Sequence, residues 1–298
     1  MKRRISKLFG LFTLVLAMSM ALLSQTASAQ NQKTTSKMQY HGGQVQTGTS
    51  NVYFIWYGCW TCGTPGTADT QRILVDFITN FGGSPYAMIN TTYPDADGNA
   101  PSGVAIYGGS VDDAYSHGPT LTESDMQGIV ANQFQNGGLP LDPWGIFIVI
   151  ASPDVVDTYA DGTSFCTPSK PPHHGIAYYN GSETRYAFIG DAARCLSTAA
   201  PQFFGPGSTS SSPNGNIAAD AMASSLAHAL DTVLTDPFGT AWFDRYGLEN
   251  ADKCTGTFGQ TYTTANGARA NMKLGFRDYL IQQNWINGRR SYCGLSLP

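Results

Sequence analysis

The chain has few charged side chains and little basic charge. Charged residues make up 13% of its 298 residues, and 17 Lys and Arg stand against 21 Asp and Glu, a formal net charge of −4. Arg289 and Arg290 form an isolated basic pair. Proteins that bind nucleic acid or anionic membranes depend on larger basic patches, so the sequence argues against both kinds of partner.

Long apolar runs and several common enzyme motifs are also missing. After residue 23, no stretch is long and apolar enough to cross a bilayer, so we expect no membrane span in the mature chain. The sequence has no internal repeat, no phosphate-binding glycine loop and no Gly-x-Ser-x-Gly elbow. These absences argue against a P-loop nucleotide-binding protein and against an α/β-hydrolase.

The N-terminal segment has the pattern of an export signal. Residues 1–29 combine a basic start, an apolar run from Leu8 to Leu23 and the small-residue site Ala27-Ser28-Ala29, which predicts a signal peptide cleaved after Ala29. A membrane anchor fits less well, because the apolar run is short and contains Thr and Ser. Cleavage removes four basic residues and no acidic one, which moves the formal net charge from −4 to −8. We therefore expect a secreted, extracellular protein.

All the cysteines follow this signal. An even number in an exported chain favours disulfides over free thiols, although the sequence alone permits several connectivities. Order along the chain suggests three local bridges: Cys59–Cys62, Cys166–Cys195 and Cys254–Cys293. Cys59-x-x-Cys62 can instead be a redox pair that exchanges disulfides, but no apolar helix start follows it to lower the pKa of the first thiol.

Alternating strand and helix patterns predict a mixed α/β fold, with a central sheet, flanking helices and disulfide-stabilised loops. The all-apolar runs 51–58 and 144–151 are typical of buried strands, and we expect them to be neighbours in one sheet. Amphipathic patterns predict a helix from Thr67 or Asp69 to Phe81 and another from Thr122 to Phe134.

The remaining segments complete the domain. A hairpin is predicted around Asn180-Gly181, and a last strand from Tyr279 to Trp285. Residues 30–40 are polar and predict a disordered tail. We expect a single domain over residues 41–298.

Residues 217–254 carry the pattern that bears most on function. Ala-rich, Pro-free composition predicts a helix over residues 217–234, which begins near Asn214 or Asn216 and ends at Asp236-Pro237. Small and polar side chains form a narrow stripe along one face of this helix, and His228 lies on that stripe.

This helix has the outline of a metallopeptidase helix, in which a His and a ligand four residues later face the same way and a Glu beside the His acts as general base. Here Ala229 stands in the place of the base and Thr232 in the place of the second ligand. Glu249 and Asp252 follow the helix and can supply oxygen ligands, so His228, Glu249 and Asp252 are candidate zinc ligands. The alternative is that His228 is an ordinary packed or solvated histidine.

The adjacent pair His173-His174 also invites a metal hypothesis. Neighbouring His side chains project differently unless the backbone turns, so such a pair seldom binds one ion without further ligands.

Several stretches in series resemble a known family. They are NVYFIWYGCW and QRILVDFITNF within residues 41–81, then YGGSVDDAYS, GIFIVIASPDV, HHGIAYYNGSETRYAFIGD, GNIAADAMASSLAHALDTVLTDPFGTAWFD, ENADKC, LIQQNW and YC. Together they resemble the EXORDIUM/phosphate-induced protein 1 family of secreted proteins. The resemblance implies an extracellular or cell-wall-associated protein, associated in plants with growth and cell expansion, without an established reaction.

The resemblance also implies a zincin-like central helix. In family members this helix commonly reads His-Glu-x-x-Glu, with or without an Ala before the last Glu, or close to it, and an acidic E-x-A-D-x-C segment follows. Carried onto this chain, the His is His228 and the acidic segment is residues 249–254, but Ala229 and Thr232 replace the two glutamates.

Two functions follow as expectations. The first is a secreted, non-catalytic protein without a cofactor, which binds a cell-wall polysaccharide or a surface protein. The second is a zinc-dependent, metallopeptidase-like hydrolase with a degenerate HExxE site that uses His228, Glu249 and Asp252. Loss of a general base typically costs about 10²–10⁴-fold in rate, so the Ala at position 229 favours the first expectation.

Overall fold

The computed structural model describes residues 36–60, 67–204 and 211–298. The export signal expected over residues 1–29 lies outside these ranges, and so does Cys62. Within the described ranges, every helix is too short or too polar to cross a membrane.

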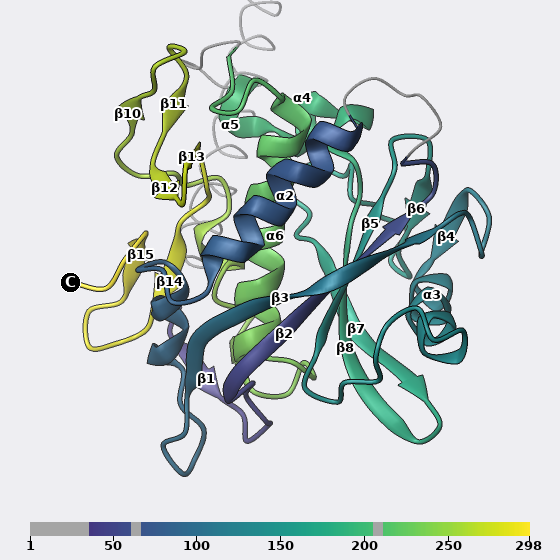
Figure 1. Ribbon diagram of the computed structural model, residues 1–298. Helices are drawn as coiled ribbons and strands as arrows, with labels where there is room; N and C mark the ends of the chain where they lie inside the picture. Colours follow the sequence, from purple (N-terminus) through teal and green to yellow (C-terminus); the bar gives the residue numbers. More distant parts are fainter. Residues whose placement is uncertain (1–35, 61–66, 205–210) are drawn as a thin grey trace, which may run out of the picture.

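A central sheet of five strands runs through the molecule (Figure 1). In spatial order the strands are β3 (Pro101–Asp113), β2 (Gly48–Tyr57), β5 (Ile146–Ala151), β8 (Ser182–Ile189) and β7 (His173–Tyr179). The first four are parallel to one another, whereas β7 is antiparallel to β8 and forms a hairpin with it. The two apolar runs predicted as strands correspond to β2 and β5, and they are neighbours as expected.

Three long helices cover the two faces of this sheet (Figure 1). They are α2 (Thr67–Phe81), α3 (Glu123–Gln135) and α6 (Ile217–Thr235). α2 and α6 pack against each other on one face, and α3 lies on the other. Every residue of β5 is therefore buried, which explains why its sequence is apolar throughout rather than alternating. The predicted mixed α/β fold with flanking helices is confirmed.

Shorter elements surround this framework. The short strands are β1 (Met38–Tyr40), β4 (Thr120–Thr122), β6 (Val156–Thr158), β9 (Trp242–Asp244), β10 (Tyr262–Thr263), β11 (Arg269–Ala270), β12 (Met272–Leu274), β13 (Arg277–Tyr279), β14 (Asn284–Ile286) and β15 (Tyr292–Gly294). The short helices are η1 (Ala87–Thr92), η2 (Ala192–Arg194), α4 (Leu196–Ala199), α5 (Pro201–Phe204) and η3 (Asp252–Cys254). The short strands join in two-stranded pairs outside the central sheet.

The helix starts follow the predicted capping residues. The Thr122 hydroxyl accepts a hydrogen bond from the backbone N–H of Asp125, and the Asp125 carboxylate accepts one from the backbone N–H of Thr122, which completes a capping box at α3. At α6 the side-chain oxygen of Asn216 accepts from the Ala219 N–H at 3.1 Å. α6 ends at Thr235, directly before Asp236-Pro237.

Two sequence predictions differ from the structure. Residues 38–40 form β1 and pair with β9, so the tail predicted over residues 30–40 does not reach Tyr40. The predicted last strand from Tyr279 to Trp285 is broken, because β13 and β14 are separate and each pairs within its own hairpin.

Disulfides join the loops outside the sheet. Cys166 is bonded to Cys195 and Cys254 to Cys293, and both bridges were predicted. Cys59 is also disulfide-bonded, and its predicted partner Cys62 lies outside the described residues.

Candidate functional site

A pocket of about 730 Å³ opens where α6 meets several loops, and we call it the α6 pocket. α6 supplies Ala221, Ser224, Ser225 and His228 to its wall. The other lining residues come from three further segments and from Gln282. The segments supply Phe165 and Thr167–Pro172, then Ser197–Ala199 with Pro201 and Gln202, and finally Leu248, Asp252, Lys253, Thr255, Gly256 and Phe258. The four α6 residues belong to the stripe of small and polar side chains predicted from the sequence. Thr232 and Thr235, the last two residues of that predicted stripe, do not line the pocket.

His228 is held from both sides of its ring. It is 5% exposed, and its Nε2 lies 3.0 Å from Asp252 Oδ1. Its Nδ1 lies 3.3 Å from the side-chain nitrogen of Gln282. The amide N–H of Gln282 donates to Nδ1, so Nε2 carries the proton that is donated to Asp252. His228 and Asp252, two of the candidate metal ligands, are therefore in direct contact.

Gln282 is fixed in the orientation that this arrangement requires. Its side-chain nitrogen also donates to the Ala251 carbonyl at 2.9 Å, and its side-chain oxygen accepts from the Gly256 N–H at 3.1 Å. Its backbone N–H donates to Ser224 Oγ at 3.0 Å. One glutamine thus connects α6 with both sides of η3, a role that the sequence pattern did not reveal.

Glu249 points to a different histidine. Its Oε2 lies 2.9 Å from Nε2 of His174, while its backbone N–H donates to Asp252 Oδ2 at 3.0 Å. Burial by itself lowers the pKa of His174, but the Glu249 carboxylate, with Asp236 and Asp252 near it, raises that pKa to about 9. Glu249 and Asp252 therefore belong to two separate His–carboxylate pairs.

The adjacent residues His173 and His174, considered above as a metal-binding pair, also contact different partners. Nε2 of His173 lies 3.0 Å from the Tyr186 hydroxyl, on the other side of β7 from the Glu249 partner of His174. Within residues 36–60, 67–204 and 211–298, no three or more His, Cys, Asp or Glu side chains are grouped so as to hold a metal ion.

Thr232, four residues after His228, forms its side-chain hydrogen bonds within α6 itself. The Thr232 hydroxyl donates to the backbone carbonyls of His228 and Ala229, at 3.3 and 3.1 Å. Ala229 and Thr232 are both buried, and neither is among the residues that line the α6 pocket. The structure brings together His228 and Asp252, but not the rest of a zincin-type ligand set.

A buried acid, Asp231, lies one turn after His228 on α6. Asp231 Oδ1 accepts a hydrogen bond from the Asn90 side chain at 2.7 Å, and the Asn250 side chain donates to the Asp231 carbonyl at 3.2 Å. Burial raises the pKa of Asp231 to about 7, against the opposing effect of hydrogen bonds from Asn90 and Tyr86. This network belongs to the protein core rather than to the pocket.

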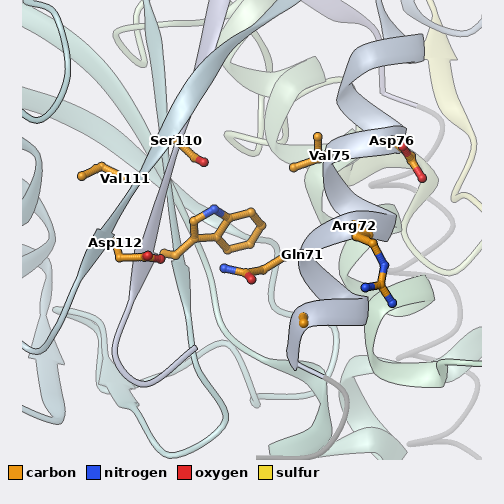
Figure 2. Close-up of a pocket in the computed structure, with 9 residues that line it drawn as sticks. Gln71, Arg72, Val75, Asp76, Ser110, Val111 and Asp112 are labelled. Carbon is orange, nitrogen blue, oxygen red and sulfur yellow. The ribbon is translucent and has the colours of Figure 1, made fainter. Parts of the chain in front are cut away.

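A second, more open groove of about 520 Å³ lies between α2 and the edge strand β3 (Figure 2). Gln71 and Val75 project from α2 toward the strand, which contributes Ser110 and Asp112 (Figure 2). Trp56 also lines the groove but is only 4% exposed. This groove has fewer buried polar side chains than the α6 pocket, which makes the α6 pocket the stronger candidate site.

Comparison with known proteins gives a consistent set of relatives. The sequence model of the phosphate-induced protein 1 conserved region matches residues 38–273. The chain is 28% identical to Protein EXORDIUM-like 3 of Arabidopsis thaliana, with 86% of this chain and 82% of the relative covered. It is 24% identical to Protein EXORDIUM of Arabidopsis thaliana, with 85% and 83% covered. It is 26% identical to Protein PHOSPHATE-INDUCED 1 of Nicotiana tabacum, with 74% and 72% covered. No solved structure matches the chain.

Proposed function

Because the chain belongs to the phosphate-induced protein 1 family, we propose that it is a secreted, non-catalytic protein that binds a ligand at the cell surface or wall. The α6 pocket is the binding site. The observation that carries this proposal is the state of His228, whose two ring nitrogens are both engaged by side chains of the protein itself.

Zinc binding would require a different arrangement of His228. A zinc-bound imidazole presents the lone pair of one ring nitrogen to the metal, at about 2.0–2.1 Å. Here the Nδ1 lone pair accepts from Gln282 and the Nε2 proton is donated to Asp252. In addition, Ala229 has no carboxylate to activate a water molecule. Both features support binding rather than hydrolysis.

The disulfides support a preformed pocket in an oxidising compartment. Cys166 lies between the pocket residues Phe165 and Thr167, and Cys254 lies between Lys253 and Thr255. Two loop walls of the pocket are therefore each fixed by a covalent bridge. Disulfides persist mainly in secreted proteins, and a pocket fixed in advance loses less conformational entropy when it binds a ligand.

Retention on isolated cell-wall and surface material tests the binding function. Ser225→Tyr places a bulky ring in the α6 pocket, and Ser110→Tyr places the same ring in the groove between α2 and β3. We expect the wild type and Ser110→Tyr to be retained, and Ser225→Tyr to be lost in the wash. Equal retention of all three proteins would assign binding to another surface.

The contact between His228 and Asp252 inside a pocket is the observation that favours the rival function, a zinc-dependent hydrolase. Purified mature protein, loaded with zinc and then dialysed, is expected to keep no stoichiometric metal and to leave peptide substrates intact. One zinc per chain, lost together with peptide cleavage in His228→Ala, would establish the hydrolase instead.

A further inference from the structure

We propose that the α6 pocket takes a neutral oligosaccharide, a ligand without carboxylate, sulfate or phosphate groups. This inference rests on the proposed function and specifies the class of ligand. It comes from the charges, hydrogen-bonding groups and apolar surfaces of the lining residues.

The charged side chains in the lining already have polar partners within the protein. His228 contacts Asp252, which also lines the pocket. Lys170 Nζ lies 2.6 Å from Asp161 Oδ2. Lys253 Nζ lies 2.9 Å from Asp244 Oδ2, and both of these side chains are fully buried. Asp252 accepts hydrogen bonds from His228 and from the Glu249 N–H, so its carboxylate disfavours an anionic ligand. Both lysines among the described lining residues are paired with carboxylates, so the lining offers no unpaired cation to a carboxylate, sulfate or phosphate group.

Hydroxyl and amide groups dominate the polar part of the lining. They belong to Thr167, Ser169, Ser197, Thr198, Gln202, Ser224, Ser225, Thr255 and Gln282. Such groups match sugar hydroxyls, because each sugar hydroxyl donates one hydrogen bond and accepts others. A ligand rich in hydroxyls is therefore better matched than an apolar one.

The side-chain amide of Gln202 is available to a ligand. The residue is 7% exposed and lines the pocket, and its Nε2 is buried without a hydrogen-bond partner among the described residues. Buried amide donors are nearly always paired in folded proteins, so this N–H₂ group is suited to donate to an oxygen of the ligand. Ser224, His228 and Gln282 are buried to a similar degree, which gives the pocket a polar floor.

Apolar surfaces face the same space. Pro168, Pro171 and Pro172 come from one loop, and Phe258 comes from the segment after η3. Flat apolar surfaces beside a few placed polar groups are typical of small-molecule sites, and they suit the C–H face of a sugar ring. The pocket volume of about 730 Å³ also lies within the usual range of such sites.

A peptide fits the same walls less well. Extended peptides are commonly bound by an exposed strand edge, and helical peptides by a long apolar groove. The described walls of the α6 pocket consist of loops, short helices and the polar stripe of α6. The lining therefore favours the oligosaccharide.

The test measures binding of three probe sets by calorimetry on the full mature protein. The probes are neutral β-glucan, xyloglucan and mannan oligosaccharides, acidic oligogalacturonates, and proline-rich peptides. Gln202→Leu removes the unpaired amide at nearly constant size, and Gln71→Leu is the matched control in the groove between α2 and β3. Circular dichroism and the thermal midpoint confirm that each variant folds.

We expect a neutral oligosaccharide to bind, Gln202→Leu to weaken that binding about tenfold, and Gln71→Leu to leave it unchanged. Neutral binding that is insensitive to both Gln202→Leu and Ser225→Tyr would overturn the site. Tighter binding of the acidic or peptide probes, sensitive to Gln202→Leu, would overturn the ligand class and leave the proposed function intact. If no probe binds, the proposed ligand class is wrong. The proposed non-catalytic function is overturned by a different result, which is zinc-dependent cleavage of a peptide.

Discussion

Four titratable residues on or beside α6 have raised pKa values in the folded protein. Burial raises the pKa of Asp220 and of Asp236 to about 6, and that of Asp231 to about 7. His174 has its pKa raised to about 9, because the attraction of Glu249 exceeds the opposing effect of burial. In all four cases the folded protein holds its proton more tightly than the unfolded chain does.

The sign of the pH dependence follows from these shifts. Each group stabilises the fold fully below its unfolded pKa, and this contribution is lost as pH rises through the folded pKa. The carboxyl of Asp231 therefore gives a free energy of unfolding that falls between about pH 4 and pH 7. Asp231→Asn, which keeps an acceptor for Asn90, should make that part of the profile less steep in urea unfolding, and Asp220 and Asp236 should retain part of the slope below about pH 6.

Asp97→Asn is a suitable control for this experiment, because Asp97 is exposed. It should leave the slope between pH 4 and pH 7 as in the wild type. An unchanged slope in Asp231→Asn would show that Asp231 does not carry the effect.

Lys253 and Asp244 give a second prediction at the residue scale. Their ion pair is fully buried, and the Lys253 ammonium also lies 5.0 Å from the centre of the Trp285 ring. Asp244→Asn leaves a buried cation without its counter-charge, which typically costs about 3–5 kcal/mol. Urea unfolding should show a loss of this size, whereas Lys273→Ala, at an exposed ion pair, should change stability by less than about 1 kcal/mol. Equal losses of stability in Asp244→Asn and Lys273→Ala would contradict a stabilising role for the buried ion pair.

At the scale of elements, α6 depends on a cap that also ties it to α2. The Asn216 side chain accepts from the Ala219 N–H at 3.1 Å and donates to Thr70 Oγ1 at 3.2 Å. Asn216→Ala should lower the free energy of unfolding by about 0.5–2 kcal/mol, while Asn216→Ser, which keeps a capping oxygen, should lose less. Thermal unfolding of both variants measures the difference, and equal losses would mean that the cap is unimportant.

Elements with a strong local pattern could be predicted from the sequence. α2, α3 and α6 show amphipathic or Ala-rich patterns with capping residues, and β2 and β5 are apolar throughout because helices cover both faces of the sheet. β1 could not be predicted, because its polar sequence becomes a strand only through pairing with β9, about 200 residues later. The break between β13 and β14 likewise depends on partners that the alternating pattern does not specify.

The candidate site was predictable only in part, for the same reason. The stripe on α6 and the acidic segment after it identified His228 and Asp252 as candidate ligands, and the two side chains are in contact. The pairing of Glu249 with His174 was not foreseen, because it joins β7 to a loop far along the chain. Gln202 and Gln282 come from short or irregular segments whose position is set by the tertiary structure, and no local sequence signal distinguished them.

At the scale of the whole molecule, the disulfides hold the parts that lie outside the central sheet. Cys254–Cys293 connects η3, beside the α6 pocket, to β15 near the C-terminus. Removing a native disulfide typically costs about 2–5 kcal/mol, so Cys254→Ser/Cys293→Ser should unfold at lower denaturant concentration. Because this bridge also fixes one wall of the pocket, the double variant should bind ligand more weakly even under conditions where it is folded.

The imidazole ¹⁵N spectrum of His228, recorded before and after one equivalent of zinc, tests most directly whether this residue is held by the protein rather than available to a metal. The protein should show the proton on Nε2 with Nδ1 as a hydrogen-bond acceptor, and zinc should leave both signals in place. A stoichiometric shift of either nitrogen to a metal-bound position, absent in His228→Ala, would contradict the non-catalytic binding function and favour the zinc enzyme.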